Sequence, residues 1–578
     1  MPKKTAKESV KKDKNQTKQK IRGGILIAIG LGALIFIAFF LFSKFFRPQP
    51  LAEILPADQT LGFIEVNVDG ESQQVEQFSE LLSNHAVYQR GGMIALLNQV
   101  FPVSFTNDVE PWLGRQIGLA GLTNQEGITT PLIFIESSDH EATVEFFKAR
   151  TLDVQNESMI ETEYQNGTIY SFEMSQQFAF TFAEQYLVLA PTPEDLELFF
   201  DGYYDQPRLI ENEKYRKVAN NLSRGGLAFA YIDLEKLFET LEKDKKFVSL
   251  KGQELLAFKP YTSLFTAEGL TIFAEKDRFT AQTYTSLNKT VLNDEPYVTF
   301  EEDYQSELLS YLGEDPIVLI GGHDFTAEWS RIEEIFKSGS KTPALLFDGT
   351  VEAQKDRYFG ESIGLKEDIY PLLTGEYAMS IENSLENPQI SVLLKLKDSN
   401  DIPRFERVVS EFIKVSGVFS PIEQEVELPD GTIAREIVAS PEQIEQSTKN
   451  HGQATITSLR LGNTGIQLHY TIIDNTILAS NSEQNLQQII DRVQGTASTN
   501  LTTTHAFERH IQPILRNADQ VLRMKIGALT ERLGLTQTGE GTPFNGMLAP
   551  YLVPWNNFTM AKNFFEDGVS TTYFVEVL

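Results

Sequence analysis

A long apolar run stands near the N-terminus. Residues 25–42 are eighteen consecutive residues without a charge, rich in Ile, Leu, Phe and Ala, between Arg22 and Lys44. At about 1.5 Å per residue, a helix over this run covers roughly 27 Å, and its aromatic and basic flanks extend it toward the roughly 30 Å of membrane hydrocarbon. The pattern predicts one transmembrane helix over 22–46, with Ile25 to Phe42 as its apolar anchor.

Short alternating runs and runs of helical spacing follow one another in the first half of the remaining chain. Leu61–Val68 alternates apolar and polar residues like a half-buried strand, whereas Val75, Phe78 and Leu81 have the spacing of an amphipathic helix. Further strands are expected at Gln116–Leu122, Pro131–Glu136, Gly167–Glu173, Phe178–Leu189, Gly269–Glu275 and Phe279–Leu287, and further helices at Met93–Val100, His140–Arg150, after the cap Thr192-Pro193-Glu194-Asp195, and at Glu213–Leu222.

The second half repeats this pattern. Its expected elements are an apolar strand at Ile317–Ile320, a helix opened by Ser482-Glu483, a helix at Ala506–Asn517, and strands at Phe558–Phe565 and Val569–Val577. Strands joined by short turns are mixed with strands joined by helices. The predicted class is therefore α+β in both halves, with antiparallel or mixed sheets and helices packed on one face.

The two halves also match residue by residue, which indicates a tandem duplication. Pro111-Trp112-Leu113 corresponds to Pro371-Leu372-Leu373 at an offset of 260, each after an acidic turn, Asn107-Asp108 or Glu367-Asp368. Later matches, from Thr181 with Thr471 to Asp277 with Asp567, share an offset of 290. Such long repeats mark duplicated domains rather than solenoid units.

The change of offset predicts an insertion in the second copy. We expect it in the polar run Ser440 to Gly465, as a surface loop. The domain boundary is expected in Asn293-Asp294-Glu295-Pro296. The predicted organisation is a basic tail over 1–21, the transmembrane helix over 22–46, a first α+β domain over 47–292 and a second over 293–578.

Charge gives the orientation in the membrane. Residues 1–20 hold eight lysines and two acids, whereas residues 48–578 hold 39 basic and 78 acidic residues. Positive charge before the span keeps the tail in the cytoplasm, so the bulk of the chain is expected outside the cell membrane, as a single-pass protein. A cleavable signal peptide is the alternative, but the run is long and Ser43-Lys44-Phe45 offers no small-residue cleavage site. Because the ectodomain carries a large net negative charge, we do not expect it to bind nucleic acid.

The amino-acid composition predicts globular domains and excludes several classes of site. With 41% hydrophobic residues and 40 Phe the chain can fold into globular domains, and about 530 extracytoplasmic residues need two or more of them. The absence of cysteine excludes disulfides, thiol nucleophiles and cysteine-based metal sites, and fits a bacterial envelope. The phenylalanines at 178, 180, 182, 199 and 200 would line a lipid groove, but core packing is the simpler interpretation.

No motif assigns an activity, and no catalytic, cofactor-binding or metal residues are predicted. Gly360-Glu361-Ser362-Ile363-Gly364 fits the G-x-S-x-G pattern of a hydrolase, which needs a strand before the serine and a helix after it. The preceding Val351–Tyr358 has helical spacing instead. Asp398-Ser399-Asn400-Asp401 resembles part of a calcium loop but lacks its glycine and distal glutamate, so helix capping is the simpler role.

The histidines show no metal spacing either. His505 and His510 lie five residues apart, on different faces of a helix. His323 and Asp324 follow a predicted strand, where sites often form, but a hydrogen-bonded loop histidine is the simpler interpretation.

Three short motifs resemble a known family. They are Leu55-Pro56-Ala57-Asp58 before a strand, Glu110-Pro111-Trp112-Leu113-Gly114, and the run from Gly364 to Leu373. With the N-terminal span, they look like the bacterial family of domain of unknown function 3352, over most of residues 50–578. The second copy departs from the pattern with Leu372 and Thr374. The resemblance implies a membrane-anchored exported protein and supplies no catalytic residues.

The leading hypothesis is a non-enzymatic binding or scaffold protein of the bacterial envelope, without cofactor. The alternatives are a carrier of a lipid or another apolar ligand, and a serine hydrolase that uses Ser362.

Overall fold

The computed structural model describes most of the chain after the N-terminal 49 residues. The described residues are 50–83, 104–124, 126–155, 158–172, 178–243, 263–293, 296–298, 306–338, 341–418, 422–427, 432–438, 444–461, 466–515, 518–527 and 555–577. They fall into two compact units: unit 1 lies within Met1–Lys243 and Ala267–Arg278, and unit 2 within Asp244–Thr266 and Phe279–Leu578. The predicted boundary near residue 293 stays a prediction.

The predicted membrane anchor, Ile25 to Phe42, lies outside the described residues. Among the helices of the described residues, none is both long and apolar enough to cross a membrane.

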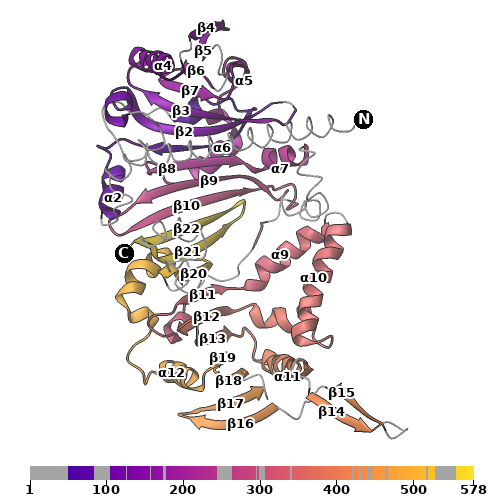
Figure 1. The fold of residues 1–578 in the computed structure, drawn as a ribbon. Coiled ribbons are helices and arrows are strands. Elements are labelled where there is room, and N and C mark those ends of the chain that lie inside the picture. Colours follow the sequence, from indigo (N-terminus) through magenta and orange to yellow (C-terminus); the bar gives the residue numbers. More distant parts are fainter. Residues whose placement is uncertain are drawn as a thin grey trace. The chain divides into compact units, whose positions relative to one another are not determined.

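Unit 1 is an antiparallel sheet with helices (Figure 1). In space its strands follow the order β4, β5, β6, β7, β3, β2, β1, β8, β9, every neighbouring pair being antiparallel. Its strands are β1 (Thr60–Asn67), β2 (Leu113–Thr123), β3 (Thr129–Ser137), β4 (Met159–Tyr164), β5 (Gly167–Phe172), β6 (Ala179–Ala183), β7 (Tyr186–Ala190), β8 (Ala228–Asp233) and β9 (Phe265–Ala274). Its helices are α2 (Gln73–Leu81), α4 (His140–Gln155), α5 (Pro193–Asp205), α6 (Glu213–Asn220) and α7 (Leu234–Lys243), with short turns η1 (Leu51–Glu53), η3 (Phe105–Val109) and η4 (Leu209–Glu211).

Unit 2 pairs its strands in a similar order. From β16 the sheet runs through β17, β18, β19, β13, β12, β11, β20 and β21 to β22, and β10 (Arg278–Leu287) pairs with β22. Its strands are β11 (Val318–His323), β12 (Glu376–Asn383), β13 (Pro388–Lys395), β16 (Ile444–His451), β17 (Ala454–Leu461), β18 (Ile466–Ile473), β19 (Thr476–Ser480), β20 (Gln520–Lys525), β21 (Trp555–Phe565) and β22 (Gly568–Val577).

Unit 2 also contains helices and short helical turns between its strands. They are α9 (Phe325–Ser338), α10 (Lys341–Phe359), α11 (Ile402–Val418), α12 (Glu483–Val493) and α13 (Gln512–Leu515), with short turns η5 (Leu308–Tyr311), η6 (Leu365–Ile369), η7 (Tyr370–Leu373), η8 (Ser399–Asp401), η11 (Leu501–Thr503) and η12 (Phe507–Ile511). The α+β class and the antiparallel sheets are as predicted.

Helices cover both faces of the unit 2 sheet, so the prediction of helices on one face is wrong. Ile477 packs into one core cluster with Phe405 of α11, whereas its neighbour Leu478 packs into another with Leu486 of α12. Successive residues of a strand point to opposite faces. The strand β19 is therefore apolar on both sides, as strands between two helical layers are.

Helix caps are found where the sequence predicts them. At the start of α5, the hydroxyl of Thr192 accepts from the N–H of Asp195, whose carboxylate accepts in turn from the N–H of Thr192. At the start of α12, the side chain of Ser482 accepts from the N–H of Asn485. Each cap satisfies donors that a helix start leaves open.

Two expectations from the sequence are wrong. Phe178–Leu189 is not one strand, because Glu184 takes a positive φ of 52° and turns the chain between β6 and β7. In the polar run that is expected to be a surface loop, residues 444–451 and 454–461 form the paired strands β16 and β17. A separate hairpin consists of β14 (Ile422–Glu427) and β15 (Ile433–Val438).

Candidate functional site

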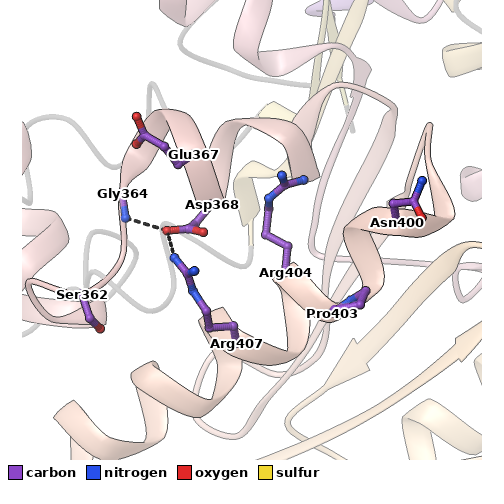
Figure 2. A pocket seen from close by; sticks show the side chains of 8 residues that line it. All are labelled: Ser362, Gly364, Glu367, Asp368, Asn400, Pro403, Arg404 and Arg407. Carbon is purple, nitrogen blue, oxygen red and sulfur yellow. Dashed lines mark hydrogen bonds and ion pairs between the residues drawn. The ribbon is translucent and has the colours of Figure 1, made fainter.

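A hollow of unit 2 lies between the helical turn η6 and the first turns of α11. Its volume is about 710 Å³. Most of its lining is polar, and both an acidic and a basic wall are present (Figure 2). The residues that line it are Ser362, Gly364, Glu367, Asp368, Asn400, Pro403, Arg404 and Arg407.

Glu367 and Asp368 of η6 form the acidic wall of the hollow, and Asp368 fixes the conformation of this turn. Its Oδ2 accepts from the backbone N–H of Gly364 at 2.8 Å, and its own N–H donates to the carbonyl of Gly364 at 2.9 Å. The side chain is 6% exposed and forms an ion pair with Arg407. One carboxylate thus closes the turn η6 and faces the cation of α11.

The basic wall comes from the first two turns of α11. Arg404 and Arg407 are three residues apart, so they lie on one face of the helix. Arg404 forms an ion pair with Asp401, and its side chain is 33% exposed; the side chain of Arg407 is 55% exposed. Each guanidinium has five N–H donors in a planar fork. Donors therefore remain for a ligand in the hollow.

Ser362 lines the hollow but does not have the setting of a hydrolase nucleophile. It is exposed and lies in a turn that follows the helix α10, where the G-x-S-x-G mechanism needs a strand. The lining contains no histidine. The sequence pattern is thus present in this chain without its strand–serine–helix context.

Asp398, at the edge of the candidate calcium loop, has a capping role. Its Oδ1 accepts from the N–H of Asn400 at 2.8 Å, which holds the pKa of this carboxyl below its usual range. Among the described residues, no group of three or more His, Asp or Glu side chains is arranged to hold a metal ion.

The histidines singled out in the sequence do not come together at this hollow. His323 is buried at the end of β11, and Asp324 after it caps α9 by accepting from the N–H of Ala327 at 3.1 Å. His510 lies 3.4 Å from a carboxylate oxygen of Glu576.

Unit 1 has a smaller hollow beside its own acidic turn. Its volume is about 330 Å³, and mostly apolar residues line it: Pro111, Trp112, Ala142, Phe146 and Ala149, with Asn107 and Asp108. Here Oδ2 of Asp108 accepts from the N–H of Ser104, four residues earlier, at 2.8 Å. Asp368 accepts in the same way from the N–H of Gly364, and we call this side-chain-to-backbone hydrogen bond the brace of the turn. The indole of Trp112 donates to the carbonyl of Asp108 at 2.7 Å.

The phenylalanines of unit 1 pack in its core. Phe180 is fully buried in a cluster with Trp112, Phe172 and Leu187. Phe199 and Phe200 of α5 are also buried, and the ring of Phe199 lies 5.8 Å from that of Phe134 on β3. The core-packing interpretation of these residues is confirmed.

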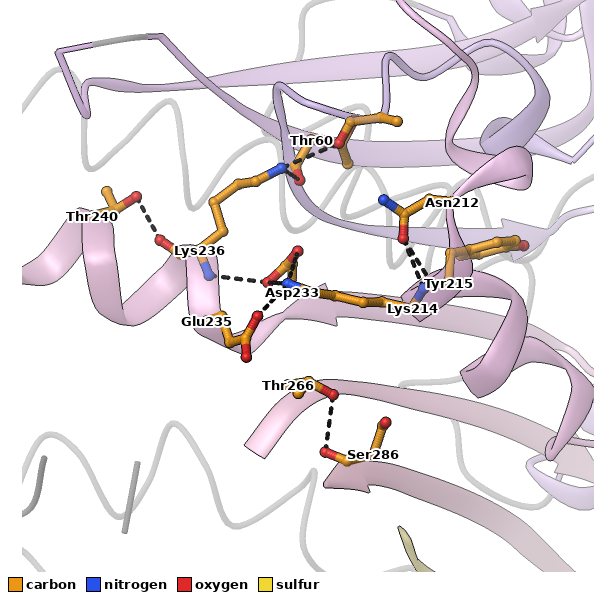
Figure 3. A network of polar contacts seen from close by, with 11 residues as sticks. Thr60, Asn212, Lys214, Tyr215, Asp233, Glu235, Lys236, Thr240, Thr266 and Ser286 are labelled. Carbon is orange, nitrogen blue, oxygen red and sulfur yellow. Dashed lines mark hydrogen bonds and ion pairs between the residues drawn. The ribbon is translucent and has the colours of Figure 1, made fainter. Parts of the chain in front are cut away.

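A second polar cluster, at the start of α7 in unit 1, holds the fold together (Figure 3). Asp233 accepts from the backbone N–H of Lys236 at 2.9 Å and from the ammonium of Lys214 at 3.2 Å. The Nζ of Lys236 donates to the carbonyls of Thr60 at 2.8 Å and Ala57 at 3.2 Å. Every charge drawn into this cluster has a partner within the unit, so we assign it a structural role.

The arginine pair is the feature that sequence reasoning missed. The repeat alignment places Asp108 opposite Asp368, and inspection of the first two turns of the following helices would have shown arginines in α11 and none in α4. The contact itself joins residues 39 positions apart and required the fold.

The family assignment rests on a match over residues 23–405, more than half of the chain, to the model described as "Protein of unknown function (DUF3352)". The chain belongs to this family. No curated protein matches its sequence.

Solved structures give only distant similarity. Crystal form III of TP0453 covers 44% of this chain and 90% of its own at 12% identity, with a TM-score of 0.24. Crystal form I of the same protein covers 44% and 89% at 13% identity, again with a TM-score of 0.24. At this TM-score the similarity carries no argument about function.

Proposed function

We propose that this DUF3352 protein is a non-enzymatic binding protein of the bacterial envelope, held in the membrane by Ile25 to Phe42 with its N-terminus in the cytoplasm. The observation that carries the binding role is the hollow of unit 2, where the exposed guanidinium groups of Arg404 and Arg407 face a polar cavity of about 710 Å³. Cavities with a few convergent polar groups are the usual place of ligand sites.

We further propose that the two units are copies of one ancestral domain, over 47–292 and 293–578. The similar order of strand pairing supports this: β1–β2, β2–β3 and β3–β7 in unit 1 parallel β11–β12, β12–β13 and β13–β19 in unit 2. The paired braces of Asp108 and Asp368 support it as well.

Protease treatment of intact cells tests the location. If the chain is anchored as proposed, external protease digests residues beyond the anchor and leaves the lysine-rich tail, detected with a tag before Ile25. Full protection of the large portion in intact cells, with digestion after lysis, would contradict the proposed orientation.

An activity screen tests the non-enzymatic assignment. The full chain in detergent is assayed with esterase, phosphatase and glycosidase substrates, next to a Ser362→Ala variant. We expect no turnover above buffer from either protein. Turnover that Ser362→Ala abolishes would establish the hydrolase instead.

The hollow of unit 1 favours a second candidate, a carrier of an apolar ligand. Trp112, Phe146 and Pro111 line it, and its volume of about 330 Å³ suits a ring or a short chain. Mass spectrometry of the native protein tests this candidate: a co-purified lipid or aromatic compound that is lost in Ala142→Phe would support it. A native mass equal to that of the bare chain would exclude it.

A further inference from the structure

We infer that the hollow of unit 2 recognises a single anionic group, a carboxylate or a phosphate, through Arg404 and Arg407. This inference rests on the proposed function, since it assigns the ligand class of the same hollow. Planar guanidinium groups bind the oxygens of carboxylates and phosphates through paired hydrogen bonds. Asn400 and Ser362, which also line the hollow, can hydrogen-bond the neutral remainder of such a ligand.

The two arginines keep donors free although each has an acidic partner. Asp368 and Asp401 are nearly buried, with side-chain exposures of 6% and 11%, whereas those of Arg407 and Arg404 are 55% and 33%. The ion pairs join Nη2 of Arg407 to Asp368 and Nη1 of Arg404 to Asp401, so the other guanidinium nitrogens can serve a ligand in the cavity that both arginines line. Figure 2 shows Arg407 next to Asp368.

Unit 1 shows that the fold does not require this arginine pair. Its turn keeps the same brace, Asp108 to the N–H of Ser104 at 2.8 Å, and no described residue forms an ion pair with Asp108. The third residue of α4 is Ala142, whereas the third residue of α11 is Arg404. The arginines are thus an addition to a turn that is complete without them.

The other charges of the hollow restrict the ligand to one negative group. Glu367 lies over Gly364, and in Figure 2 its carboxylate points away from both arginines. It would repel a second anionic group on that side and accept from a hydroxyl or ammonium there. The ligand that fits has an anionic group toward α11 and donors toward η6.

The absence of native cysteine allows a direct test. Glu361→Cys, at an exposed position beside the hollow and outside its lining, is labelled with an environment-sensitive fluorophore in the full chain in detergent and reports any ligand that enters the hollow. Glucuronate and glycerol 3-phosphate are titrated at constant ionic strength, with glucose as the neutral control. We expect one or both anions to change the fluorescence and glucose to have no effect; which anion binds tells carboxylate from phosphate.

Variants then locate the binding. In this background, Arg404→Ala and Arg407→Ala are each expected to weaken anion binding at least about tenfold, as the loss of a charge-assisted hydrogen bond does. Arg460→Ala, an exposed arginine on β17 outside the hollow, is the matched control and leaves binding unchanged. Circular dichroism verifies folding, and Arg404→Lys keeps the charge but loses the planar fork, so it also weakens binding.

Two negative results are distinguishable. Neither anion binding, or binding that both alanine variants retain, overturns the inference. If a small-molecule extract of the envelope still changes the fluorescence, the hollow binds another class of ligand and the proposed function stands. If neither anions nor the extract change it, the inference and the binding role both fail.

Discussion

The backbone N–H of Leu308 donates to Oε1 of Glu376 across 2.8 Å, in a buried setting. Unit 1 has a similar contact, in which the N–H of Leu51 donates to Oε2 of Glu65 at 3.0 Å. In both cases a glutamate on a strand satisfies the first donor of a short helical turn, η5 or η1. The glutamate comes from β12 in unit 2 and from β1 in unit 1.

The burial of these two glutamates predicts that stability falls with rising pH. Burial raises the pKa of Glu376 to about 8 and that of Glu65 to about 7, from the usual 4.5. Between pH 4.5 and these values the folded protein keeps a proton that the unfolded chain releases, so the free energy of unfolding decreases as pH rises. Glu376→Gln keeps an acceptor without titrating. We expect the free energy of unfolding of this variant to decrease less between pH 5 and 8.5 than that of the wild type, by on the order of a few kcal/mol.

Thermal unfolding of both proteins from pH 5 to 8.5 measures the effect. Every acidic protein loses some stability through charge repulsion at high pH, so the informative quantity is the difference between the variant and the wild type. Glu386→Gln, an exposed glutamate in the same unit, controls for the lost charge. Equal pH slopes for Glu376→Gln and the wild type would show that Glu376 titrates normally.

The elements with local signals were predictable from the sequence. Thr192 and Ser482 mark the starts of their helices, because the side chain of a capping residue accepts a hydrogen bond from the backbone N–H only three positions further along the chain. The turn at Glu184 was missed, since glutamate seldom takes a positive φ and nothing nearby marks the break. The strand β16 was missed because its polar, exposed residues give no hydrophobic alternation. The strand β17 does alternate at its start, with Ala454 and Ile456 buried and Thr455 exposed between them.

The site was less predictable than the fold. The hydrolase pattern at Ser362 lies beside the candidate hollow, but the hollow itself is formed by η6 and α11. The two walls approach each other only after β12 and β13 pair between them. No local pattern reports such a contact.

Asp368 is expected to stabilise unit 2 more than its partner Arg407 does. Asp368→Ala leaves the N–H of Gly364 without its acceptor and should cost about 1 to 3 kcal/mol of unfolding free energy. Arg407→Ala should cost about 1 kcal/mol or less, because the arginine is half-exposed and Gly364 still holds the carboxylate. Urea unfolding measures both. The reverse order would mean that the ion pair, rather than the brace, holds the turn.

Trp112 is expected to be the most sensitive residue of the unit 1 hollow. It is 4% exposed, and its ring lies 5.6 Å from that of Phe146. Trp112→Ala should destabilise the protein by about 3 to 5 kcal/mol through the cavity it leaves. Trp112→Phe should cost about 1 to 2 kcal/mol, mainly for the lost hydrogen bond to Asp108. Ile128→Ala, at a residue 57% exposed, serves as the control in the same urea titration.

Lys236 is expected to act as a structural tie rather than a reactive lysine. Its ammonium donates to the carbonyls of Thr60 and Ala57, so it fixes the start of β1 to α7. Lys236→Met keeps the apolar stem but leaves both carbonyls without this donor, and should cost about 2 to 3 kcal/mol of unfolding free energy. Lys276→Met, at an exposed turn position, should change stability by less than about 0.5 kcal/mol. If both variants unfold at the same urea concentration, water replaces the ammonium at no cost and the tie contributes nothing.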